Sequence, residues 1–168
     1  MTATRVYVDT SVVVHFLHPA SEHGHAKARA FFLDLERSAY QGVVSDFCRL
    51  EYCGYLKDEI ATIKSGNVTK TDIDLWMGKF DSLLDDYGVE EISADALLST
   101  PFVSDCREVI EKSTPVRDER DDWLVVKGAD SVHAVLAARC EADFLATLDK
   151  GFRGLQDGVK PMVLWDTY

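Results

Sequence analysis

The sequence predicts an α/β fold, in which helices cover both faces of a parallel sheet. Short apolar segments of strand type recur along the chain, at Arg5–Val8, Gly42–Ser45, Val89–Ile92, Asp143–Thr147 and Pro161–Trp165. Longer segments with apolar residues at helical spacing lie between them. Strands that alternate with helices form parallel sheets whose connections cross the faces, so this order gives the fold class.

The predicted helices carry recognisable start and stop signals. They run from a cap at Ser21 to about Arg37, from Asp46 to about Ile63, from Thr71 to Tyr87, from Thr100-Pro101 through Ile110, and from Ala129 to Cys140. The clearest is the third, whose apolar residues form one stripe that ends at Gly88. Ser113–Asp122 is polar and is predicted as a loop, whereas Trp123–Val126 fits a strand or a helix equally well.

The composition is typical of one globular domain spanning residues 1–168. Hydrophobic residues make up 46% and charged residues 28%. No apolar stretch could cross a bilayer and the first residues lack a secretory pattern, so we expect a cytoplasmic protein without a membrane partner. Four cysteines without zinc-type spacing are expected to be reduced thiols. A net charge of −11 argues against a broad basic nucleic-acid face, but acids that hold cations would contribute to it.

Four acidic residues stand at positions that suggest a site. Asp9 and Asp149 each follow a predicted strand, and ligands of parallel sheets bind beyond the carboxyl ends of strands. Glu51 shares a helix face with apolar residues, where a carboxylate needs a cation or hydrogen-bond donors. Asp130 lies in the first turn of a helix. Taken singly, each acid could instead be a turn or capping residue.

Four segments, in order, resemble the motifs of PIN-domain nucleases. They are an opening strand with an acid, a serine followed by a helical glutamate, an aspartate that opens an alanine-rich helix, and a strand ending in Thr-x-Asp, at Val6–Val14, Ser45–Glu51, Ala129–Ala138 and Ala142–Phe152. The resemblance covers nearly the whole chain. It implies a PIN-like three-layer fold, with a central five-stranded parallel sheet flanked by helices and the acids gathered in one cleft.

The same resemblance implies a metal-dependent ribonuclease, in which Asp9, Glu51, Asp130 and Asp149 are catalytic and hold Mg²⁺ or Mn²⁺. Carboxylate oxygens suit these ions better than zinc. Asp9 and Asp149 are expected to be direct ligands, whereas Glu51 and Asp130 could bind directly or through water. The chain is similar to the VapC toxins of toxin–antitoxin pairs, which implies an RNA substrate, a small antitoxin partner and a homodimer.

The third acid of the motif has rivals in the acidic segment that precedes it. Asp118, Glu119, Asp121 and Asp122 lie within Ser113–Lys127, a stretch longer and more charged than compact family members need. Asp130 is preferred because it opens a helix and is followed by the Asp-x-x-His-Ala pattern.

Further residues beside the motifs are candidates for contact with RNA or with the acids. Hydroxyl groups and basic groups of this kind are Thr10, Ser11, Arg49, Thr147, Lys150 and Arg153. His133 follows Asp130 by one helical turn and could approach the cleft or serve a structural role. The histidines between positions 15 and 25 match no standard metal motif.

Two other functional classes compete with the metal-dependent ribonuclease. A PIN-fold RNA-binding or scaffold protein with weak or no nuclease activity is the alternative, and the complete set of acids disfavours it. An aspartate-based phosphate-transferring enzyme of the haloacid-dehalogenase type is disfavoured because Ser11 stands where a second aspartate is required. No P-loop motif occurs.

Overall fold

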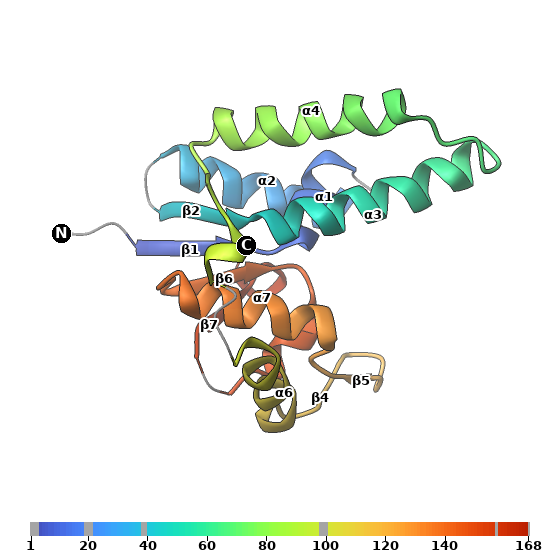
Figure 1. Cartoon of the computed structure of the whole chain (residues 1–168). Helices are drawn as coiled ribbons and strands as arrows, with labels where there is room; N and C mark the ends of the chain where they lie inside the picture. The colour runs from blue at the N-terminus through green and yellow to red at the C-terminus, as the bar shows by residue number, and fades with distance from the viewer. Residues whose placement is uncertain (1–3, 19–21, 38–39, 98–100, 157, 168) are drawn as a thin grey trace.

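Five parallel strands form the central sheet of the computed structural model, which describes residues 4–18, 22–37, 40–97, 101–156 and 158–167 (Figure 1). The strands are β1 (Thr4–Val8), β2 (Tyr40–Ser45), β3 (Glu90–Ile92), β6 (Phe144–Thr147) and β7 (Lys160–Val163). Their order is β3-β2-β1-β6-β7. This arrangement confirms the predicted fold class, including the five-stranded parallel sheet.

The strand order reverses beside β1. From β1 the chain first builds outward through β2 to β3, and it later returns to add β6 and β7 on the other side. Val6 therefore pairs with Gly42 of β2 and with Phe144 of β6. The carboxyl ends of β1 and β6 are neighbours at this reversal, which is where open α/β sheets bind ligands.

Helices flank the sheet, with α4 at the top and α6 at the bottom of the view in Figure 1. The helices are α1 (Thr10–Leu17), α2 (Glu22–Glu36), α3 (Asp46–Ile63), α4 (Lys70–Asp86), α5 (Ala94–Leu97), α6 (Phe102–Lys112), α7 (Gly128–Arg139) and α8 (Leu164–Thr167), with a 3-10 turn η1 at Lys150–Gly154. In the described parts of the chain, no helix is both long and apolar enough to span a membrane.

Helix α1 is the main element that the sequence analysis did not predict. Its sequence, TSVVVHFL, is rich in β-branched residues, which favour strands when judged alone. Val12 and Val13 are fully buried, and this tertiary packing outweighs the local preference. Helix α1 matters for the site because it begins at Thr10 and so turns the chain immediately after Asp9.

Three other predictions changed in detail. The expected strand at Pro161–Trp165 ends at Val163, and α8 begins at the next residue. The expected loop Ser113–Asp122 contains β4 (Val116–Arg117), which pairs antiparallel with β5 (Trp123–Leu124), so the ambiguous segment begins as a strand. The caps expected at Ser21 and Thr100 lie outside the described residues.

Local signals account well for α4. Its N-cap is Thr69, whose hydroxyl accepts a hydrogen bond from the Asp72 backbone N–H while the Asp72 carboxylate accepts one from Thr69 N–H. This reciprocal capping satisfies donors that a helix start otherwise leaves unpaired. Phe80, Leu83 and Leu84 are the buried part of the stripe seen in the sequence.

Candidate active site

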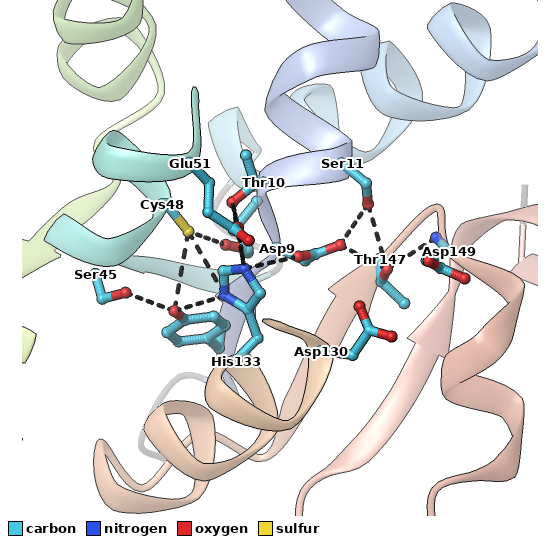
Figure 2. Close-up of polar contacts among 12 residues, drawn as sticks. Asp9, Thr10, Ser11, Ser45, Cys48, Glu51, Asp130, His133, Thr147 and Asp149 are labelled. Carbon is cyan, nitrogen blue, oxygen red and sulfur yellow. Dashed lines mark hydrogen bonds and ion pairs between the residues drawn. The ribbon is translucent and has the colours of Figure 1, made fainter. Parts of the chain in front are cut away.

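A cleft of about 270 Å³ opens at the carboxyl ends of β1 and β6, and all four predicted acids line it. The acids come from the end of β1, from α3, from the start of α7 and from the segment between β6 and η1 (Figure 2). The complete lining is Asp9, Thr10, Ser11, Val14, Glu51, Tyr55, Asp130, His133 and Asp149. Residues separated by up to 140 positions thus meet because β1 and β6 are adjacent.

Asp9 is the most deeply buried of these acids, with 5% of its surface exposed. The hydroxyl groups of Ser11 and Thr147 donate to its Oδ2 atom, at 2.5 and 2.8 Å. Its other oxygen, Oδ1, lies 3.3 Å from Nε2 of His133. The two hydroxyls hold the carboxylate of Asp9 so that its Oδ1 atom faces the imidazole of His133.

Asp130 and Asp149 are each anchored through one oxygen. The backbone N–H of Lys127 donates to Oδ2 of Asp130, and that of Gly151 donates to Oδ1 of Asp149, both at 2.7 Å. No donor among the described residues bonds to the other oxygen of either side chain. Burial raises the pKa of Asp130, and the charges of Asp149 and Asp9 raise it further against the effect of the Lys127 hydrogen bond.

Glu51, which is half-buried, and His133, which is buried, form a close pair. Oε2 of Glu51 accepts a hydrogen bond from the Thr10 hydroxyl at 2.6 Å and lies 2.5 Å from Nε2 of His133. Burial alone would raise the pKa of Glu51, but His133, through its hydrogen bond and charge, and Thr10 lower it. Burial alone would lower the pKa of His133, but the charge of Asp9 and the hydrogen bond to Glu51 help to raise it well above its ordinary value.

Donor atoms of Asp9, Glu51 and His133 all lie within 4.8 Å of one another, which makes this trio a candidate divalent-ion site. Among the residues that line the cleft, only His133 can carry a positive charge opposite four carboxylates. The cleft is therefore short of positive charge, and a divalent cation fits its oxygen-rich donor set. The role of His133 is open from the sequence, and the structure places it in the cleft with Asp130, one helical turn away.

The three predicted hydroxyl residues all contact cleft acids directly. Thr10 bonds to Glu51, whereas Ser11 and Thr147 bond to Asp9. The backbone N–H groups of Leu148 and Asp149, just after β6, in turn donate to the hydroxyls of Ser11 and Thr147, respectively. Their geometry is that of groups that hold carboxylates in place.

Arg49 lies away from the cleft. Its guanidinium bonds to both carboxylate oxygens of Glu91 at 2.7 Å and to Asp81 at 2.7 Å, where α3 meets β3 and α4. Hydrogen bonding to Glu91 raises its pKa further. The structure therefore does not bring Arg49 together with the acids, and it gives this side chain a structural contact instead.

Lys150 and Arg153 follow Asp149 on η1 and are each paired with an acid. Lys150 lies 2.9 Å from Glu119, and Arg153 forms two hydrogen bonds with Asp166. Both pairs are at the surface, where ion pairs contribute little and exchange partners readily. These two bases remain predicted RNA contacts beside the cleft.

Three of the four rival acids between β4 and β5, namely Asp118, Glu119 and Asp121, bond to neighbouring groups. Oδ1 of Asp118 accepts the backbone N–H groups of Arg120 and Asp122, and Asp121 pairs with Arg117. None of the hairpin acids lines the cleft, whereas Asp130 does. This placement agrees with the choice of Asp130 as the third acid of the motif.

No protein-family model and no curated protein matches the sequence, but solved structures do match its fold. A chain of the Rickettsia felis VapBC2 complex, crystallised with a DNA fragment from its promoter, matches with a TM-score of 0.56 and 15% identity over 94% of this chain and 97% of that chain. Mycobacterium tuberculosis VapC20, described as a toxin that cleaves the sarcin-ricin loop, matches with a TM-score of 0.54 and 10% identity over 90% of this chain and 96% of that one. The chain has a VapC-like PIN fold. At these identities, the similarity bears on the fold alone, and it confirms the fold that the four motifs predicted.

Proposed function

We propose that this PIN-fold protein is a divalent-metal-dependent endoribonuclease and the toxin of a VapBC-type toxin–antitoxin pair. The observation that carries the proposal is the meeting of Asp9, Glu51, Asp130 and Asp149 in one cleft at the sheet reversal. Similarity in fold to VapC structures, one of them an RNA-cleaving toxin, supports the same activity by analogy.

The four carboxylates, together with His133, are the groups that would hold Mg²⁺ or Mn²⁺. Such an ion supplies activation of a water for attack on phosphorus and stabilisation of charge on the leaving oxygen. Ser11 and Thr147 hold Asp9 in one orientation, and backbone N–H groups do the same for Asp130 and Asp149. The site is therefore ordered before substrate arrives, which reduces the cost of reorganisation during reaction.

Burial and acidic neighbours raise the pKa of Asp130, and a divalent cation held by the same carboxylates would oppose this effect and keep Asp130 ionised. Lys150 and Arg153, on η1 beside Asp149, would exchange their surface ion pairs for contacts with RNA phosphates.

The partners proposed here follow from the VapC analogy. A small antitoxin would bind and silence the enzyme, and the enzyme would act as a homodimer. The VapBC2 complex was crystallised on promoter DNA, so a DNA-binding antitoxin encoded immediately upstream would support the toxin role. Co-expression with that gene product and recovery of one stable complex would test the pairing.

Cleavage of a mixed panel of structured RNAs by the purified protein tests the activity. We expect cleavage with Mg²⁺ or Mn²⁺ and none with a chelator. Asp130→Asn should abolish cleavage, whereas Asp122→Asn in the hairpin serves as the matched control and should retain it. Equal activity of the Asp130 variant would refute its assignment, and absence of cleavage by wild type under every condition would favour the binding-protein alternative.

A further inference from the structure

A buried chain of polar groups lies directly behind His133, and the proposed mechanism does not use it. The Tyr7 hydroxyl lies 2.6 Å from Oγ of Ser45 and 3.1 Å from Nδ1 of His133. Tyr7 comes from β1, Ser45 from the end of β2 and His133 from α7. All three side chains are almost entirely buried. Polar groups in such a place are costly unless they bond to one another, so the chain has a structural purpose.

The position of Tyr7 decides which ring nitrogen of His133 faces the acids. Nδ1 is directed to the Tyr7 hydroxyl, and Nε2 is directed to Glu51 and Asp9. A hydroxyl can accept one hydrogen bond while it donates another. Tyr7 can therefore accept Nδ1–H of His133 and donate its own proton to Ser45.

With Nδ1–H held by Tyr7, an ion that displaces the Nε2 proton directed to Glu51 and Asp9 meets the lone pair of Nε2. Histidines that bind metals usually donate their other ring N–H to a fixed acceptor, which sets the tautomer and the ring orientation. Cys48 is the other polar group near Nδ1, but its sulfur lies 4.0 Å away and is directed to the carbonyl of Val8 at 3.3 Å. Tyr7 is thus the strong partner of Nδ1.

We propose that Tyr7, backed by Ser45, is a positioning residue that presents Nε2 of His133 as a nitrogen donor to the divalent ion beside Asp9 and Glu51. This inference rests on the proposed metal-dependent function and adds to it the identity of one ligand and an ion preference. An imidazole donor favours Mn²⁺ over Mg²⁺, because Mg²⁺ selects hard oxygen ligands. The site should therefore bind Mn²⁺ more tightly than Mg²⁺.

Binding of Mn²⁺ to the purified full chain, without RNA, tests the inference. Electron spin echo measurements on the Mn²⁺-loaded wild type should show coupling to a directly bound ¹⁴N nucleus, and His133→Gln should lose it. Tyr7→Phe keeps the aromatic ring but removes the hydroxyl. Its Mn²⁺ affinity in calorimetric titration should fall about 10–100-fold, the usual cost of removing a group that orients a ligand.

Tyr52→Phe is the matched control, because the Tyr52 hydroxyl also bonds to a histidine nitrogen, Nε2 of the half-buried His18 at 2.8 Å, but away from the cleft. It should leave Mn²⁺ affinity within about twofold of wild type. In metal-free protein, ¹⁵N spectra should report a changed protonation pattern of the His133 ring in Tyr7→Phe alone. This second readout separates a positioning role from a general loss of stability.

The outcomes distinguish this inference from the ribonuclease proposal. RNA cleavage with Mn²⁺ but no nitrogen coupling, or an unchanged Mn²⁺ affinity in Tyr7→Phe, would overturn the role of His133 and Tyr7 and leave the nuclease intact. Nitrogen-coupled Mn²⁺ without RNA cleavage would support the ion site and count against the ribonuclease. Absence of Mn²⁺ binding would overturn the inference.

Discussion

Replacement of Asp9 by asparagine is the sharpest single perturbation of the cleft, because it removes one charge and keeps the shape of the side chain. Asp9 is nearly buried and accepts hydrogen bonds from Ser11 and Thr147. Asparagine keeps a carbonyl oxygen that accepts one of these bonds, but its NH₂ group cannot bind a cation. The variant therefore separates the role of the charge from the role of packing.

The expected effects on stability and on activity differ in size. In Asp9→Asn, the hydrogen bonds from Ser11 and Thr147 either go to a neutral acceptor instead of a carboxylate or are lost. Each change costs about 1 kcal/mol, so the free energy of unfolding falls by about 2 kcal/mol at most. Relief of repulsion from Asp130 and Asp149 offsets part of that loss. Activity should fall at least about 100-fold, since removing a group that merely orients a metal ligand already costs about 10–100-fold. This corresponds to about 2.7 kcal/mol or more of transition-state stabilisation.

The assay pairs RNA cleavage with thermal unfolding, each with and without Mn²⁺. For wild type, an ion present at about 100 times its dissociation constant should add about 2.7 kcal/mol of stability, and Asp9→Asn should lose most of that increase. Asp143→Asn is the matched control, because Asp143 accepts the Arg5 backbone N–H at 2.8 Å near the opposite ends of the same strands. Full cleavage by Asp9→Asn, or an equal metal-induced stabilisation, would refute the assignment of Asp9.

Two further predictions concern the pH dependence and the support of the site. The pKa of His133 is raised in the folded protein, so its stabilising effect is complete below the unfolded-state pKa of about 6.5 and is lost as pH rises through the folded-state value. In chelator, the unfolding free energy of wild type should therefore fall more steeply above neutral pH than that of His133→Gln, and parallel urea-denaturation profiles would contradict this. Gly154→Ala would bring a methyl group to 2.1 Å from the Thr114 carbonyl oxygen, so urea denaturation should show a loss of about 1–3 kcal/mol. The control Gly78→Ala, in α4, meets no neighbouring atom and should instead add up to about 1 kcal/mol. Equal stability of the two variants would argue against the close approach of η1 to Thr114, just before β4.

Local patterns were sufficient to predict most of the elements and the four acids. The alternation of apolar strands with helical segments follows from hydrogen bonding and burial that repeat along the chain, so it is visible without coordinates. The positions of Asp9 and Asp149 after strands, and of Asp130 at a helix start, are likewise local. Their agreement with four ordered motifs was enough to predict the PIN fold.

Helix α1 and the position of Arg49 depended on contacts that no local pattern contains. The β-branched residues of α1 favour a strand until Val12 and Val13 are buried, and tertiary packing then decides the conformation. Arg49 stands two residues before Glu51, but the helical turn directs its guanidinium to Glu91 and Asp81. Sequence proximity to an acid therefore did not place Arg49 in the cleft.

The sequence by itself determined the fold class and the acids that line the cleft, because strand ends and helix starts are local features. Only the tertiary structure decided that β1 and β6 are neighbours and that His133 joins Asp9 and Glu51. It also placed Tyr7 and Ser45 behind the imidazole. Those contacts join residues from separate strands and helices, and their distances follow from how the elements pack rather than from the order of residues along the chain.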